Sequence, residues 1–227
     1  MAPFSRSTFK WLLAAQVLAR VDEGEESLDR VVRYGPGDLL EYAPVTRERV
    51  EEGGLSVSEL CAAAVQVSDN TAANLLLATV DSPAGFTAYL RTLGDSTTRL
   101  DRTEPELNEA APGDPRDTTT PAAMLEDLRA VLLGDVLAPA SRERLIDWMV
   151  TSTTGLARLR AGLPEGWRTG DKTGTCGRGT ANDVAIIWPP GREPILIAAY
   201  LAEAEASYED CNAALAEVAR GIVGSFA

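Results

Sequence analysis

The sequence predicts an α/β fold of the α+β kind, in which helices flank an antiparallel sheet. Apolar residues recur at helical spacing over most of the first part of the chain, strand-like segments follow one another after Gly166, and a helical segment closes the chain. We therefore expect one globular unit over residues 1–227. Its mainly helical part is expected at 7–150, and its sheet-and-helix part at 151–227.

The helical part is predicted from periodicity and from residues that favour helix ends. Apolar side chains recur every three or four positions between Ser7 and Val21, so that Ser7 begins a helix. The segment 33–46, with Pro36, Gly37 and Pro44, is expected to be a loop. Ser56 and Glu59 form a capping box for the next helix. That helix is expected to reach about 67, and others are expected from near 70 to 80 and at 83–93, 121–133 and 142–151.

The sheet follows a long segment, 99–120, that carries charge, proline and glycine but no apolar period. Loops of that length are uncommon unless they have a function. Beyond it, strands are expected at 167–176, 184–188 and 194–201, and a last helix at 208–223. Adjacent strands after a run of helices indicate an antiparallel sheet with helices on its faces.

Composition excludes several classes of partner. The formal net charge of −13 would repel nucleic acid and anionic lipid, so a small-molecule substrate fits better. No apolar run is long enough to cross a bilayer, and residues 1–10 lack the apolar stretch of a secretory signal. The cysteines, Cys61, Cys176 and Cys211, show no metal-like spacing, and we expect neither a metal nor a cofactor.

Two features of composition bear on the chemistry. The chain has no histidine, which excludes Ser-His-Asp and Cys-His catalysis. Among its 21 basic residues only Lys10 and Lys172 are lysines. Lysine can lose its proton when burial lowers its pKa, whereas arginine cannot. Their scarcity suggests two positions where an amine is required, unless it reflects a simple compositional bias.

The two lysines lie in two of three short motifs. Ser7 and Lys10, three residues apart, share one face of the predicted helix, and the helix start favours a developing oxyanion. Alone, this S-x-x-K pair would more often be a helix cap with a solvated lysine. However, Ser68-Asp69-Asn70 lies between two predicted helices, and Lys172-Thr173-Gly174 lies on a predicted strand. The three motifs in this order are a known signature of class A β-lactamases and penicillin-binding proteins.

The resemblance to class A β-lactamases extends from Phe4 to the C-terminus and implies a β-lactamase/transpeptidase-like fold. It is close in SDNTAANLLL (68–77), TRLDRTEPELNEA (98–110) and DKTGTC (171–176). It is specific because of Glu104 and Asn108 in the long loop, which matches the family's ω-loop at 99–117. In the family this glutamate and asparagine position the water that hydrolyses the acyl-enzyme, and penicillin-binding proteins lack the glutamate.

The resemblance implies hydrolysis of penicillins and cephalosporins, with resistance to these antibiotics as the consequence. Ser7 would be the nucleophile, Lys10 a proton acceptor or relay, Ser68 the shuttle to the lactam nitrogen, and Glu104 the base for deacylation. Whether the lysine or the glutamate is the base for acylation stays open. The backbone N–H groups of Ser7 and Thr175 would form the oxyanion hole.

The implied substrate contacts come from several segments. Asn70 would contact the side-chain amide of the substrate, and Tyr42 would cover it from the rim or else pack within its loop. Lys172, Thr173 and Thr175 would hold the carboxylate of the substrate, with Arg158 as a helper. Asn108 and Gly174 are the other expected substrate-binding residues. The family's ion pair that closes the ω-loop matches Arg102 and Asp117, and the bond between Glu104 and Pro105 matches one that is cis in the family.

The chain also departs from its relatives. Thr175-Cys176 with Arg158 resembles the carbapenem-hydrolysing branch, where this cysteine is bridged to the residue before the nucleophile; here that residue is Arg6. Cys61 would pair with position 14, which is alanine, so we expect no disulfide from either pairing.

The usual N-terminal helix and first two strands have no counterpart before Ser7. We expect the strand at 194–201 to expose an edge and an apolar face, which would favour association of an otherwise monomeric protein.

Two origins and two alternative functions stay open. The sequence could come from a longer exported precursor or be a truncated product. A penicillin-binding peptidase or transpeptidase would be acylated without turnover, and a truncated fold could bind β-lactams without catalysis. The resemblance implies a secreted or periplasmic enzyme, although the printed chain shows no signal peptide.

Overall fold

The segment that carries Ser7 leads into a deeply buried helix. The computed structural model describes residues 6–109, 113–176 and 179–225, except for the side chain of Cys176. A 3-10 helix, η1 (Arg6–Thr8), continues into α1 (Phe9–Asp22), whose residues from Phe9 to Leu18 are buried on all sides. A helix that is apolar around its whole circumference belongs in a core. Ser7 therefore lies in the short helix that precedes α1, close to the helix start that the sequence predicts.

Several other helices pack against α1, and the helices follow the predicted order. The capping box of Ser56 and Glu59 is present at the start of α3, and Asp69 caps α4 through its side chain. Pro121 and Pro139 stand at helix starts, where their missing N–H costs nothing. The bounds are α3 (Val57–Gln66), α4 (Asn70–Thr79), α5 (Ser82–Thr92), α6 (Pro121–Leu132), α7 (Pro139–Val150) and α8 (Tyr208–Gly224).

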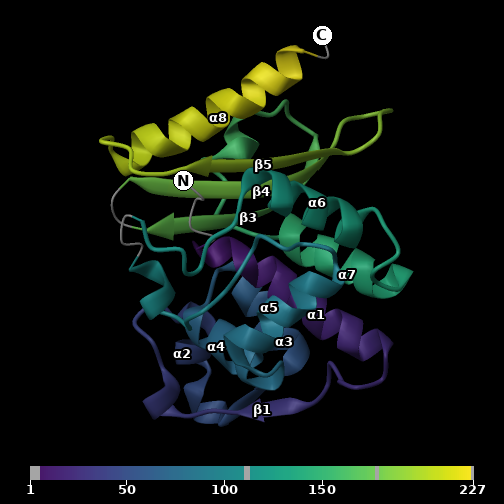
Figure 1. Cartoon of the computed structure of the whole chain (residues 1–227), viewed down its shortest axis with the longest axis vertical. Coiled ribbons are helices and arrows are strands. Elements are labelled where there is room, and N and C mark those ends of the chain that lie inside the picture. Colours follow the sequence, from purple (N-terminus) through teal and green to yellow (C-terminus); the bar gives the residue numbers. More distant parts are fainter. Residues whose placement is uncertain (1–5, 110–112, 177–178, 226–227) are drawn as a thin grey trace.

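The main sheet is antiparallel, as predicted, with the strand order β3-β4-β5. Its strands are β3 (Arg168–Cys176), β4 (Thr180–Trp188) and β5 (Ile195–Leu201). Helix α8 covers one face, and α6, α7 and η1 pack against the other, which places α1 between the sheet and the lower helices (Figure 1). A further 3-10 helix, η5 (Leu159–Gly162), packs against α8. This layering brings the start of α1 next to β3.

Some boundaries differ from the predictions. The expected loop at 33–46 contains the end of β1 (Val31–Arg33) and the start of α2 (Pro44–Glu48), with η2 (Pro36–Asp38) between them. β1 pairs with β2 (Gly54–Ser56), a sheet too short to give a periodic signal. A 3-10 helix, η3 (Val50–Glu52), precedes β2.

Two further elements begin earlier than predicted. Helix α7 begins three residues before the predicted start at 142, because Pro139 can occupy the first helical turn. β4 begins at Thr180 instead of 184, because the polar residues Asn182 and Asp183 are buried with hydrogen-bond partners for backbone or side chain.

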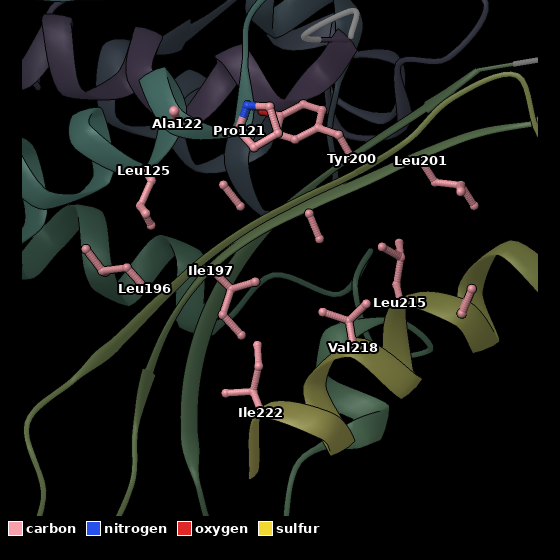
Figure 2. A pocket seen from close by; sticks show the side chains of 13 residues that line it. Pro121, Ala122, Leu125, Leu196, Ile197, Tyr200, Leu201, Leu215, Val218 and Ile222 are labelled. Atoms are coloured by element: carbon pink, nitrogen blue, oxygen red, sulfur yellow. The ribbon is translucent and has the colours of Figure 1, made fainter. Parts of the chain in front are cut away.

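An apolar groove runs along the outer edge of β5. No described strand pairs with that edge, which agrees with the expected exposed strand. In Figure 2, Leu125 of α6 lies on one side of the strands, and Val218 and Ile222 of α8 lie on the other with Ile197. The groove has a volume of about 590 Å³. Among the described helices, none is long and apolar enough to span a membrane.

Candidate active site

Ser7 lies where the helical part meets the sheet. Its segment η1 packs directly against β3, so the hydroxyl faces a cavity between the two. The Oγ atom of Ser7 donates a hydrogen bond to Oε1 of Glu104 at 3.4 Å, although 97 positions separate them in the chain. The structure therefore brings the first motif and the long loop together.

Lys10 is fully buried one turn after Ser7. Its Nζ lies 3.0 Å from Oε1 of Glu104 and donates to Oδ1 of Asn70 at 2.5 Å. It also lies 3.3 Å from Oγ of Ser68 and 2.9 Å from the carbonyl oxygen of Ser68. Burial lowers the pKa of Lys10 below its usual value, while the carboxylate of Glu104 acts in the opposite direction. Burial thus favours the neutral amine, the form that can accept a proton.

The second motif forms the turn between α3 and α4. Ser68 has a φ of 61°, in the left-handed region that few residues other than glycine adopt. Asp69 is buried and accepts hydrogen bonds from the backbone N–H groups of Val45 and Thr46, and it caps α4 by accepting from the N–H in the first turn of that helix. These bonds hold the strained turn in place. Asp69 belongs to the sequence motif, but the motif alone does not predict this role.

Glu104 is fixed by contacts at both its side chain and its backbone. The amide of Asn108 donates to Oε2 at 2.5 Å. The side chain of Asn74, in α4, bonds both the N–H of Glu104 at 2.9 Å and its carbonyl at 2.8 Å. Sequence analysis missed Asn74 because an asparagine inside an apolar helix gave no sign of a partner in a distant loop.

The neck of the long loop is closed as the resemblance implied. Arg102 forms an ion pair with the buried Asp117, with 2.6 Å between Nε and Oδ2. Asp117 also accepts from the backbone N–H groups of residues 101 and 102. The peptide bond between Glu104 and Pro105 is cis. Part of the expected loop, residues 110–112, lies outside the described residues.

The third motif runs along β3 beside Ser68. Nζ of Lys172 donates to Oγ of Ser68 at 3.1 Å and to the carbonyl of Thr173 at 2.8 Å. Burial, followed by the nearby ammonium of Lys10, lowers the pKa of Lys172 to about 7. Thr173 donates to the hydroxyl of Thr154 at 2.7 Å. Ser68 is thus bonded to both lysines of the chain.

Arg158 reaches the site through the strand and is itself buried. Its Nη2 donates to Oγ1 of Thr175 at 2.5 Å, and its Nη1 donates to the carbonyls of Gly174 at 3.1 Å and Asn182 at 2.6 Å. Its Nε donates to Oδ1 of Asn212 in α8 at 2.9 Å. The guanidinium therefore holds Thr175 in place and adds positive charge behind it.

The cavity that these elements enclose has a volume of about 620 Å³. Its lining was predicted at most positions, including Tyr42, which is 53% exposed at the rim. The predicted residues that lie behind the lining are all buried: Lys10, Glu104, Arg158, Lys172 and Gly174. The lining is Ser7, Tyr42, Ser68, Asn70, Asn108, Thr153, Thr154, Thr173, Thr175 and Tyr208.

Three lining residues were missed by sequence analysis. Thr153 and Thr154 belong to a hydroxyl-rich run after α7, which was the available signal, and Tyr208 begins α8. Ser7 and Thr175, the predicted oxyanion-hole residues, line the same cavity. Cys61 is buried and free, as expected, and the side chain of Cys176 lies outside the described part. Within the described ranges no cluster of metal-ligating side chains occurs.

The arrangement can perform nucleophilic acyl transfer followed by hydrolysis. A hydroxyl at a helix start faces a carboxylate, two buried amines contact a second hydroxyl, and threonines with a cation behind them line the far wall. Such a site can receive an anionic acyl compound. The carboxylate beside the nucleophile can also direct water onto an ester.

Comparisons with known proteins agree with this chemistry. A model of the β-lactamase enzyme family matches residues 3–226. β-Lactamase AST-1 of Nocardia asteroides is 52% identical over 96% of this chain and 70% of its own length. The carbapenem-hydrolysing β-lactamase KPC of Klebsiella oxytoca is 49% identical over 94% of this chain and 73% of its own length.

Solved structures give the same result. An ancestral class A β-lactamase superimposes with a TM-score of 0.97 at 60% identity, over 99% of this chain and 86% of the other. PenP of Rhodopseudomonas palustris, described as a class A β-lactamase, has a TM-score of 0.97 at 55% identity, over 99% of this chain and 86% of the other.

Proposed function

Because this chain belongs to the class A β-lactamases and hydrolyses the β-lactam ring, we propose that its catalytic cycle runs through an ester on Ser7. The observation that carries the proposal is the contact of Ser7 with Glu104, a carboxylate that is itself 3.0 Å from the buried amine of Lys10. A hydroxyl needs an adjacent base to act as a nucleophile, and the chain has no histidine to supply one.

In the first step Oγ of Ser7 attacks the lactam carbonyl carbon. Its proton passes to Glu104, directly or through water, or to the neutral amine of Lys10, and the ion pair links these two acceptors. The N–H groups of Ser7 and Thr175 would stabilise the oxyanion of the tetrahedral intermediate. The carbon–nitrogen bond then breaks, and the nitrogen takes a proton from Ser68, which Lys10 or Lys172 replaces.

In the second step water hydrolyses the ester. Glu104, with Asn108 bonded to its other oxygen, removes a proton from the water as it attacks the ester carbon. The bond to Ser7 breaks, and Oγ takes the proton that Glu104 removed from the water. Products are the ring-opened acid and the free enzyme.

Penicillins and cephalosporins fit the polarity of the cavity. We propose that Lys172, Thr173 and Thr175 hold the carboxylate of the substrate, with Arg158 acting through Thr175. Asn70 would contact the side-chain amide, and Tyr42 would cover the substrate at the rim. KPC is described as carbapenem-hydrolysing, so carbapenems are included among the substrates to be measured.

Turnover of a chromogenic cephalosporin tests the proposal. We expect continued hydrolysis over many equivalents and a transient mass adduct on Ser7. One stoichiometric burst without turnover would instead indicate a penicillin-binding protein, and binding without an adduct would indicate a non-catalytic fold. A Ser7→Ala variant, which keeps the cavity but lacks the nucleophile, is the control.

We also propose that the enzyme is a monomer that associates only weakly at high concentration, and that it acts outside the cytoplasm, secreted or periplasmic, as the family resemblance implies. β-Lactamase activity in spent medium or in a periplasmic extract, compared with a cytoplasmic marker, tests the location.

A further inference from the structure

The residue before the nucleophile is an arginine in a strained conformation. Arg6 has a φ of 48°, in the left-handed region, and its exposed fraction is 1%. A non-glycine residue there persists only when its surroundings fix it, and such residues gather at functional sites. Long charged side chains are rarely buried without a specific contact. Both features indicate that specific contacts hold this side chain in place.

One contact of this side chain is with the ω-loop. Nη1 of Arg6 donates to the carbonyl oxygen of Asn108 at 2.6 Å, across 102 positions of sequence. A hydrogen bond from a cationic donor is stronger than one between neutral groups. This bond therefore joins the backbone of the loop to the residue next to Ser7.

Asn108 is also the residue that holds the carboxylate. Its amide donates to Oε2 of Glu104 at 2.5 Å, while Oε1 of Glu104 faces Ser7 at 3.4 Å. The contacts run from Arg6 to Asn108, from Asn108 to Glu104, and from Glu104 back to Ser7. They close a ring around the place where water must attack the ester.

We propose that Arg6 is a positioning residue for deacylation, an inference that rests on the proposed function. Arg6 holds Asn108 and Glu104 at the distance from Ser7 that the attacking water needs. Other bonds fix the Glu104 backbone through Asn74 and the loop neck through Arg102. Arg6 fixes the main chain at Asn108. An error of about 1 Å in such positioning can cost about a hundredfold in rate.

The contacts of the remaining catalytic side chains do not pass through Arg6. Lys10 and Lys172 bond Ser68 directly. Loss of the Arg6 side chain should therefore slow deacylation much more than acylation.

The experiment separates the two steps in Arg6→Met and Arg6→Lys. Stopped-flow acylation and decay of the acyl-enzyme by intact-protein mass spectrometry are measured with one penicillin. We expect Arg6→Met to slow deacylation roughly tenfold or more, and acylation less than about threefold. Arg6→Lys keeps a cationic donor and should recover most of the deacylation rate. If Arg6→Met does not fold, Arg6→Gln, a shorter neutral side chain, takes its place.

Two controls make the result specific. Arg20 donates to the carbonyl of Thr79 at the end of α4, away from the cavity, and Arg20→Met should leave both steps unchanged. In a Glu104→Gln background, Arg6→Met should have little further effect on the residual deacylation, because the carboxylate that it positions is gone.

Each outcome bears on the inference. Equal slowing of both steps, no slowing, or the same loss in the Glu104→Gln background would overturn it. A wild-type enzyme that does not turn over would overturn the proposed function and this inference together. If the wild type turns over but Arg6→Met affects acylation and deacylation equally, only the role of Arg6 is overturned.

Discussion

Replacement of Glu104 by glutamine tests the central step of the mechanism with little change of shape. In the native site Oε1 faces Ser7 at 3.4 Å and Lys10 at 3.0 Å, and Oε2 accepts from Asn108. A glutamine can keep its oxygen toward Lys10 and turn its NH₂ toward Asn108, whose side-chain amide can flip to accept. The contacts are then kept, while the proton acceptor for water is lost.

The magnitude follows from that loss. General base catalysis contributes about 10²–10⁴ in rate, which is about 2.7–5.5 kcal/mol in activation free energy. Ser68, Lys10 and Lys172 keep their mutual contacts in Glu104→Gln, so acylation should stay measurable. The slow step becomes deacylation, and the ester on Ser7 should accumulate.

Intact-protein mass spectrometry after mixing with a penicillin measures the trapped ester. We expect most of the Glu104→Gln protein to carry one added penicillin mass for minutes or longer. Glu106→Gln is the matched control, because Glu106 is an exposed glutamate of the same loop and begins the short helix η4 (Glu106–Asn108). Undiminished turnover without an adduct in Glu104→Gln, or equal trapping in Glu106→Gln, would refute the assignment.

Three further predictions address the amine, a buried carboxyl and the groove. Lys10→Arg keeps the charge beside Glu104 but cannot release a proton, so acylation in stopped-flow assays should fall about 10²-fold or more; unchanged kinetics would remove Lys10 from the mechanism. Burial, and then Asp95, raise the pKa of Asp127 to about 8, so the folded state holds a proton that the unfolded state loses near pH 4. That contribution to stability is present below about pH 4 and is lost as pH rises toward 8, at up to about 1.4 kcal/mol per pH unit. Asp127→Asn should therefore unfold at higher urea than wild type at pH 8 and differ less at pH 5, and a pH-independent difference would refute the assignment. The exposed edge and apolar groove at β5 should produce weak concentration-dependent association in sedimentation velocity, which Val218→Glu in the groove should reduce; identical sedimentation of both proteins would argue against that surface.

The candidate catalytic residues were more readily predicted from the sequence than the residues that hold them in place. Ser7 and Lys10 could be placed together because residues three positions apart on a helix share a face. Lys172 could be placed because its motif lies on a predicted strand. No local pattern could show that Asn74 would bond the Glu104 backbone, or that Arg6 would bond Asn108, because those contacts join segments that only the fold brings together. The short strands β1 and β2 were missed because three residues are too few to show alternation.

The choice between lysine and arginine follows the requirements of the site. Arg6 and Arg158 are buried and bond backbone carbonyls, where a permanent charge and a planar set of donors suit a fixed geometry. Lys10 and Lys172 are buried and meet at the hydroxyl of Ser68, where burial lowers the pKa of both amines. A group that must exchange a proton near neutral pH needs a pKa that its surroundings can move, which excludes arginine. We infer that the two lysines persist in an otherwise arginine-only set of basic residues because proton transfer around Ser68 requires them there.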